Sequence, residues 1–191
     1  MNSHHYFDYL GGLLSISESD LNSAAASILE CIANQNSIWI MGNGGSASTA
    51  EHFETDLLFI RKGNFFPKTK VSALTANSSL ISAIANDIGF ENVFSHQLFR
   101  RAESGDLCIL ISASGNSENL IKAASAAKEI GLRTLGLLGF DGGKLAQILE
   151  TSIIVRTEIG KYGPVEDMHL AICHALSEIV GKKLALPDRP R

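Results

Sequence analysis

The strongest constraint on the fold is a regular alternation of short apolar runs with longer amphipathic stretches. Short apolar runs that end in glycine or a small polar residue are typical of strands buried on both faces of a sheet. Stretches with apolar residues at helical spacing separate these runs, and this alternation indicates a parallel sheet covered on both sides. The predicted strands are 37–42, 70–74, 106–111, 133–138 and 152–155, and the predicted helices are 20–33, 46–58, 78–88, 116–130, 143–149 and 165–184.

The sequence therefore predicts an α/β fold, with one doubly wound, parallel, five-stranded sheet and an N-terminal helical extension. The chain contains no internal repeat, low-complexity tract or long linker that would divide it. We expect a single domain over residues 1–191, with N-terminal helices in 1–35 and the α/β core in 36–186.

Composition limits the partners of such a domain. The chain carries 16 basic and 20 acidic residues, a formal net charge of −4, whereas general nucleic-acid binding needs a concentrated positive field. The apolar runs are too short to span a bilayer, and the N-terminus lacks the basic flank and apolar stretch of a signal peptide. Cys31, Cys108 and Cys173 form no CxxC pair. We therefore expect a cytoplasmic protein with reduced, buried thiols that binds neither nucleic acid nor membrane.

Two glycine- and serine-bearing loops follow predicted strands, at the sheet edge where α/β proteins bind ligands. Gly-Asn-Gly-Gly-Ser at 42–46 and Ser-Ala-Ser-Gly-Asn-Ser at 112–117 each lead into a helix, whose free amides favour an anion. Neither loop has the lysine of a P-loop or the GxGxxG pattern of a dinucleotide site. The hydroxyls of Ser112, Ser114 and Ser117 suit three oxygens of a phosphomonoester. The alternative is an ordinary strand-to-helix turn whose serines cap the helix.

Two predicted helices carry histidines and carboxylates. His52 and Asp56 share one helix face, a spacing that serves proton transfer or metal binding, the alternative being a solvated face. Pro164 fits the first position of the last helix, which would place Glu166 in its first turn. Glu166 and His174 are separated by about 12 Å along a straight helix, so an irregular helix start, another element or another subunit would have to complete a shared site. Alternatively, Glu166 is only a first-turn charge and His174 a core residue.

Four loops in this order resemble those of sugar isomerase (SIS) domains and, more narrowly, those of the phosphoheptose isomerase family. They are the two loops above together with Asn-Asp-Ile-Gly-Phe at 86–90 and Gly-Phe-Asp-Gly-Gly at 139–143, and the resemblance runs from the N-terminal helices to about Leu184. It implies a flavodoxin-like fold and a homotetramer with active sites shared between subunits. It also implies aldose–ketose isomerisation of sedoheptulose 7-phosphate through an enediol, for nucleotide-activated heptose and surface polysaccharide.

The resemblance also implies residue roles. Asp56 and His174 would be the catalytic pair. Our own hypothesis adds Glu166 as the reserve base. One zinc ion per subunit would be held by His52, Asp56, Glu166 and His174. The implied substrate-binding residues are Asn43, Gly44, Ser46, Asp87, Ser112, Ser114, Asn116 and Ser117.

The sequence departs from the family pattern at several of these positions. Asp56 stands where the family has glutamate, and Glu166 stands where it has glutamine. Two carboxylates with two imidazoles would favour a divalent ion more strongly than the family arrangement does. Ala113 replaces a threonine, and the basic residue expected after the helix is supplied by Arg61 or Lys62.

Two other functions remain open from the sequence. A non-catalytic SIS module could be a sugar-phosphate sensor, or a protein-binding relative such as the replication-initiator-associating family. The second possibility is an isomerase of another sugar phosphate, for example a pentose or hexose phosphate. The retained His52, His174 and two carboxylates favour an enzyme.

Overall fold

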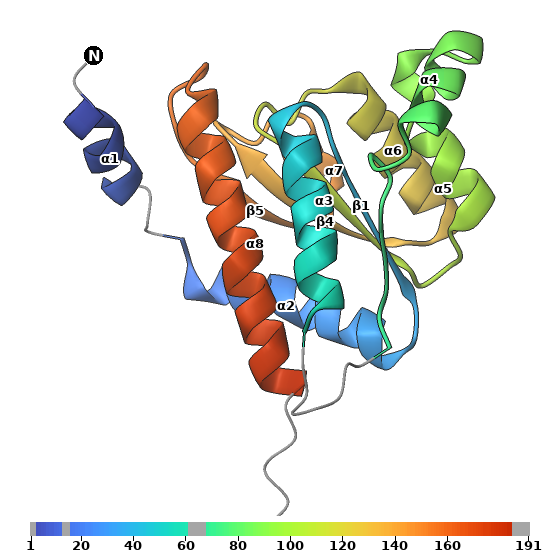
Figure 1. Ribbon diagram of the computed structural model, residues 1–191, viewed down its shortest axis with the longest axis horizontal. Helices are drawn as coiled ribbons and strands as arrows, with labels where there is room; N and C mark the ends of the chain where they lie inside the picture. Colours follow the sequence, from blue (N-terminus) through green and yellow to red (C-terminus); the bar gives the residue numbers. More distant parts are fainter. Residues whose placement is uncertain (1–2, 13–15, 61–67, 185–191) are drawn as a thin grey trace, which may run out of the picture.

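A computed structural model describes residues 3–12, 16–60 and 68–184, and it contains the predicted parallel sheet (Figure 1). The strand order is β2-β1-β3-β4-β5, and every neighbouring pair is parallel. The order reverses between β1 and β3, so these two strands form the topological switch point where such sheets bind ligands. The strands are β1 (Ser37–Gly42), β2 (Lys70–Ala73), β3 (Leu107–Ser112), β4 (Arg133–Gly139) and β5 (Thr151–Val155).

Helices cover both faces of the sheet, as the alternation predicts (Figure 1). The strand side chains alternate: Ile38 and Ile40 of β1 pack against α2, α3 and α8, while Trp39 and Met41 pack in the opposite layer, against α4, α5, α6 and α7. The helices are α1 (Ser3–Gly12), α2 (Glu18–Ala33), α3 (Gly45–Leu58), α4 (Ser78–Asp87), α5 (Ser95–Arg101), α6 (Glu118–Ile130), α7 (Leu145–Ile148) and α8 (Tyr162–Leu184), with a 3₁₀ turn η1 (Phe90–Asn92).

Three helical predictions differ from the structure. The sequence reasoning missed η1 and α5, because a helix as short as α5 shows little periodicity even though Phe94 and Leu98 bury one side of it. The predicted helix 143–149 is reduced to α7. The last helix begins at Tyr162, so Pro164 is not its first residue, and the prediction that Glu166 lies in the first turn is wrong.

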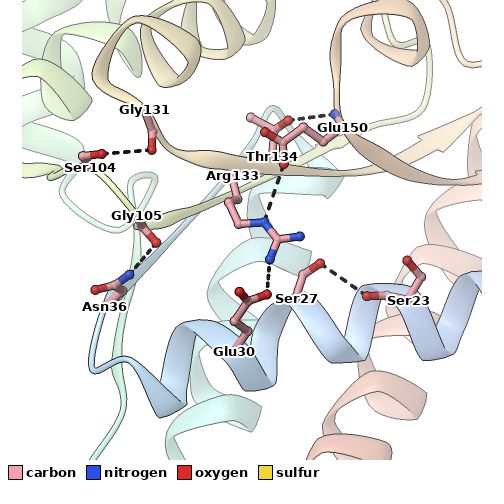
Figure 2. Close-up of polar contacts among 10 residues, drawn as sticks. All are labelled: Ser23, Ser27, Glu30, Asn36, Ser104, Gly105, Gly131, Arg133, Thr134 and Glu150. Atoms are coloured by element: carbon pink, nitrogen blue, oxygen red, sulfur yellow. Dashed lines mark hydrogen bonds and ion pairs between the residues drawn. The ribbon is translucent and has the colours of Figure 1, made fainter.

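Polar side chains connect the amino ends of the strands to neighbouring segments (Figure 2). The Asn36 amide donates to the Gly105 carbonyl oxygen at 2.6 Å. The Arg133 guanidinium bonds the Glu30 carboxylate of α2 and lies 3.7 Å from the Glu150 carboxylate. The glycine-rich loops follow the ends of β1 and β3, so they stand at the opposite, carboxyl edge of the sheet.

Two expectations from composition can be compared with the described residues. Among them, the structure contains no helix with the length and hydropathy needed to cross a membrane. Cys31, Cys108 and Cys173 are free and buried, as predicted. Burial raises the pKa of the Cys31 thiol to about 11 and raises the pKa of the other two thiols further, so all three are protonated near neutral pH.

Candidate active site

The first loop joins β1 to α3 in a tight turn. At Gly42 a Cβ atom would lie 2.6 Å from the Ser46 carbonyl oxygen, so only glycine fits. The Ser46 side chain is buried under the turn. The Asn43 side chain exchanges two amide hydrogen bonds, of 2.9 and 2.8 Å, with Asn119. Because Asn119 belongs to α6, this pair fixes the first loop beside the helix that follows the second loop.

The second loop keeps its hydroxyl groups available. The Ser112 hydroxyl accepts from the Gly115 amide at 3.0 Å, and the Ser114 hydroxyl accepts from the Asn116 amide at 3.2 Å. Each accepted bond uses a lone pair, so each hydroxyl can still donate its proton to a ligand. Ser117 is the N-cap residue of α6, but its side chain makes no capping bond. The alternative in which Ser117 serves as a side-chain cap is therefore not observed.

Loop 139–143 packs against the second loop and holds it in place. A Cβ atom on Gly115, whose φ is +62°, would lie 1.9 Å from the Gly142 carbonyl oxygen. A Cβ atom on Gly143 would lie 2.4 Å from the Ser114 carbonyl oxygen. The Leu145 amide donates to the Gly115 carbonyl oxygen at 3.0 Å. The serine loop is thus fixed before any ligand binds.

A cavity of about 700 Å³ opens beside the two loops. This volume is within the range of small-molecule sites. The Lys122 ammonium at its rim lies 3.2 Å from the Asn92 side-chain oxygen and 3.5 Å from the Glu91 carboxylate, so it ties α6 to η1. Asp87 is exposed and accepts from the Asn86 amide, and it does not line the cavity. The lining residues are Asn43, Phe90, Glu91, Ser117, Glu118, Asn119 and Lys122.

Sequence reasoning missed five of the seven lining residues: Phe90, Glu91, Glu118, Asn119 and Lys122. Asn119 had the clearest signal, because it lies within the first turn of the helix that follows the serine loop. Lys122 lies one turn further along the same helix. Phe90 and Glu91 had no such signal, because the short turn η1 was not predicted.

The predicted imidazole–carboxylate group forms where α3 and α8 lie side by side (Figure 1). The Nε2 atoms of His52 and His174 are 3.0 Å apart. Asp56 places Oδ1 3.5 Å from the His52 Nε2 and Oδ2 3.7 Å from the His174 Nε2. Both histidines are about half exposed, so the alternative of a core histidine at 174 is wrong.

These three side chains fit a divalent metal ion. Tetrahedral zinc keeps nitrogen and oxygen ligands at about 2.0–2.2 Å, which sets the ligand atoms roughly 3.3 Å apart. The two Nε2 atoms are 3.0 Å apart, and each lies near a different Asp56 oxygen, His52 at 3.5 Å from Oδ1 and His174 at 3.7 Å from Oδ2, so all three side chains come within reach of one ion. In addition, Asp56 Oδ2 is buried and has no hydrogen-bond partner among the described residues. A cation between the three groups would satisfy that oxygen.

Glu166 lies away from this group. Its carboxylate packs on Gly45, where a Cβ atom would lie 2.6 Å from Glu166 Oε2. α8 is continuous from Tyr162 to Leu184, so the helix start is not irregular and does not bring Glu166 to His174. The structure therefore groups three of the four predicted metal ligands and leaves Glu166 at the loop edge. Arg61 and Lys62 lie outside the described residues.

The cavity and the metal-ligand group do not meet within one chain. Ser46 and His52 are separated by roughly 9 Å along α3, and neither histidine lines the cavity. The cavity is lined by the β1–α3 loop, η1 and the start of α6, whereas the metal-ligand group lies between α3 and α8.

Comparison with known proteins gives consistent matches. Residues 5–139 match the SIS domain family. A phosphoheptose isomerase from Geotalea daltonii is 38% identical over 172 residues, which are 86% of this chain and 86% of that protein. A solved phosphoheptose isomerase from Neisseria gonorrhoeae aligns with a TM-score of 0.82 at 32% identity over 94% of both chains. Another from Francisella tularensis aligns with a TM-score of 0.86 at 26% identity over 95% of this chain and all of that one.

Proposed function

Because this chain belongs to the SIS domain family and, within it, to the phosphoheptose isomerases, we propose that it interconverts sedoheptulose 7-phosphate and an aldoheptose 7-phosphate. It is a sugar-phosphate isomerase that feeds nucleotide-activated heptose and surface polysaccharide synthesis. The observation that carries this proposal is the serine loop: its Ser117 lines a cavity of suitable size, and the Ser112 and Ser114 hydroxyls behind it each keep a proton to donate.

The serine loop would hold the phosphate. Ser112, Ser114 and Ser117 supply hydroxyl donors, and the first amides of α6 face the same place, where the helix dipole favours an anion. Ser46, Gly44 and Asn116 would complete the phosphate end, and Asn43 would contact the sugar. Asp87, the other sugar-contacting residue that the resemblance implies, lies outside the cavity lining of this chain. Since Asn43 is fixed by Asn119, its orientation is set before the sugar binds.

Isomerisation requires a base that removes a carbon-bound proton and an acid that protonates the oxygen of the enediol. His174 is the proposed acid, and Asp56 and Glu166 are the two carboxylates available as base. Asp56 lies within the histidine pair, whereas Glu166 lies at the loop edge. The two carboxylates therefore cannot serve one substrate position in the same chain.

We also propose one zinc ion per subunit, held by His52, Asp56 and His174. A bound ion would polarise the substrate carbonyl and orient its hydroxyls. The Nε2 atom of His174 cannot hold the ion and carry a proton at the same time, so with the ion bound the acid role of His174 would fall to its Nδ1 atom. Elemental analysis of protein purified without chelator should give about one zinc per chain. Full activity in metal-free protein would end this part of the proposal.

Sites shared between subunits of a cytoplasmic homotetramer complete the proposal. The half-exposed His52 and His174 are accessible to a neighbouring chain, and the cavity of one chain lacks them. A second subunit could place its metal-ligand group over that cavity, which would join the two halves of the site.

The direct test is a panel of ketose and aldose phosphates of five, six and seven carbons, assayed for interconversion with and without added zinc. The proposal predicts turnover of the seven-carbon pair. Preferred turnover of a pentose or hexose phosphate would change the substrate, and binding without turnover of any member would indicate a sensor.

His174→Ala should lower turnover by orders of magnitude with the fold retained, and an unchanged rate would remove His174 from the chemistry.

A further inference from the structure

We infer that Asn119 is a positioning residue for the sugar: it holds the Asn43 amide in the orientation in which that amide meets the sugar hydroxyls. This inference rests on the proposed function and deepens its sugar-binding step. It follows from the hydrogen bonds between the two side chains, from their burial, and from the place of Asn119 at the start of α6.

Two reciprocal hydrogen bonds join the two side chains. Asn43 Nδ2 donates to Asn119 Oδ1 at 2.9 Å, and Asn119 Nδ2 donates to Asn43 Oδ1 at 2.8 Å. If either amide turned over, N–H groups would face N–H groups and an oxygen would face an oxygen. The pair therefore fixes the orientation of both amides.

The pairing leaves Asn43 with a defined set of free groups. A side-chain amide has two N–H donors and two oxygen lone pairs, and the pair uses one of each. Asn43 lines the cavity and is partly exposed, so a ligand can reach its remaining N–H and its remaining lone pair. A sugar suits this combination, because each of its hydroxyls can both donate and accept a hydrogen bond.

The Asn119 side chain acts on a ligand through Asn43. It is only 3% exposed, and within the described part of the chain it bonds Asn43 alone. Without this partner, Asn43 would be free to rotate, and a sugar would have to order it on binding. Fixing a contact group in advance removes that cost.

Asn119 also connects the two ends of the proposed site. It lies in the first turn of α6, whose first amides have no acceptor within the helix and face the proposed phosphate. Its side chain crosses to the loop that follows β1, which is the neighbour of β3 in the sheet. A substitution at 119 therefore removes the hold on Asn43 and leaves the backbone amide at the phosphate end.

The first experiment is a double-mutant cycle of Asn119→Ala and Asn43→Ala, measured as kcat/KM for the seven-carbon sugar phosphate. Asn119→Ala frees the Asn43 amide, and the misplaced contact should lower kcat/KM by about 10- to 100-fold. The double variant should be no slower than Asn43→Ala alone, because both changes act through one group.

Inhibition by inorganic phosphate separates positioning from a loss of structure. Asn119→Ala keeps the backbone amides of α6, so its inhibition constant for inorganic phosphate should equal that of the wild type. Loosening of both loops would instead weaken the binding of phosphate and sugar phosphate together. Asn36→Ala is the matched control, because the Asn36 amide donates to the Gly105 carbonyl oxygen at the opposite edge of the sheet. This control should unfold more easily than the wild type and keep its kcat/KM.

Asn119→Leu, which has a side chain of similar size without an amide, replaces Asn119→Ala if that variant does not fold. Three results would each overturn the inference and leave the isomerase intact: full additivity in the cycle, a wild-type kcat/KM in Asn43→Ala or in a folded Asn119 variant, or a parallel loss of phosphate inhibition. A wild-type protein without isomerase activity would instead reject the proposed function.

Discussion

His169 is a buried residue of α8 whose charge state links pH to stability. It is 1% exposed, and neither ring nitrogen has a hydrogen bond in the described part of the chain. Loss of solvation lowers the pKa of His169 to about 4, and the nearby Leu138 backbone opposes this effect. The ring is therefore neutral in the folded protein at the pH where the isomerase would work.

Stability should consequently fall on acidification. Between pH 6.5 and 4 the unfolded chain binds a proton at His169 that the folded chain does not bind, so the free energy of unfolding decreases as the pH drops. The full effect is on the order of 3 kcal/mol, at about 1.4 kcal/mol per pKa unit. The His169→Leu variant lacks this proton. Urea unfolding should show that the free energy of unfolding of the variant, relative to that of the wild type, is higher at pH 4.5 than at pH 7.5. The same difference in free energy at both pH values would contradict the account.

At this scale, the sequence could predict the close pair of His52 and Asp56, because their spacing alone places them on one helix face. It could not predict the contact between Glu166 and Gly45. That contact depends on α3 and α8 lying side by side, which no spacing within either helix encodes.

Among the elements, the serine loop depends on how tightly loop 139–143 packs against it. Gly115→Ala should therefore lower the free energy of unfolding by more than backbone strain alone would, because the new Cβ atom would overlap the Gly142 carbonyl oxygen. Gly160→Ala is the matched control, since Gly160 also has a positive φ, +94°, but has open space around it. The control should lose about 1 kcal/mol from strain alone.

Gly115→Ala should lose clearly more stability than the control and should also raise KM for the sugar phosphate, because the displaced loop carries Ser112 and Ser114. Equal losses in urea unfolding, with KM unchanged in both variants, would show that the packing of the two loops does not position the phosphate site.

The strands were predictable because buried parallel strands are continuous apolar runs, and all five lie within a residue or two of the expected bounds. The segment from η1 to α5 was not, because its anchoring residues Phe94 and Leu98 form too short a pattern to indicate a helix. The same gap hid Phe90 and Glu91, which are two of the seven residues that line the cavity.

For the whole molecule, a shared site predicts that inactive subunits can rescue one another. Ser114→Ala damages the loop half of the site, and His174→Ala damages the metal-ligand half. If the halves come from different subunits, mixed oligomers contain some intact sites and regain activity. Native mass spectrometry should show tetramers containing both variants, and such tetramers without activity would contradict shared sites.

The same mixed-oligomer experiment tests which half of the site contains Glu166. Because Glu166 lies with the loop half, Glu166→Gln should be rescued by His174→Ala subunits and not by Ser114→Ala subunits. Rescue by Ser114→Ala would mean that Glu166 acts in the other half of the site.

The central claim is that the serine loop grips a phosphate and so presents a seven-carbon sugar for isomerisation. The most direct measurement follows two ketoses by NMR under identical conditions with zinc present: sedoheptulose 7-phosphate and unphosphorylated sedoheptulose. The account predicts conversion of the phosphorylated sugar to an aldose and no detectable conversion of the other. Equal rates for the two sugars would contradict the role of the loop, and conversion of neither would contradict the isomerase itself.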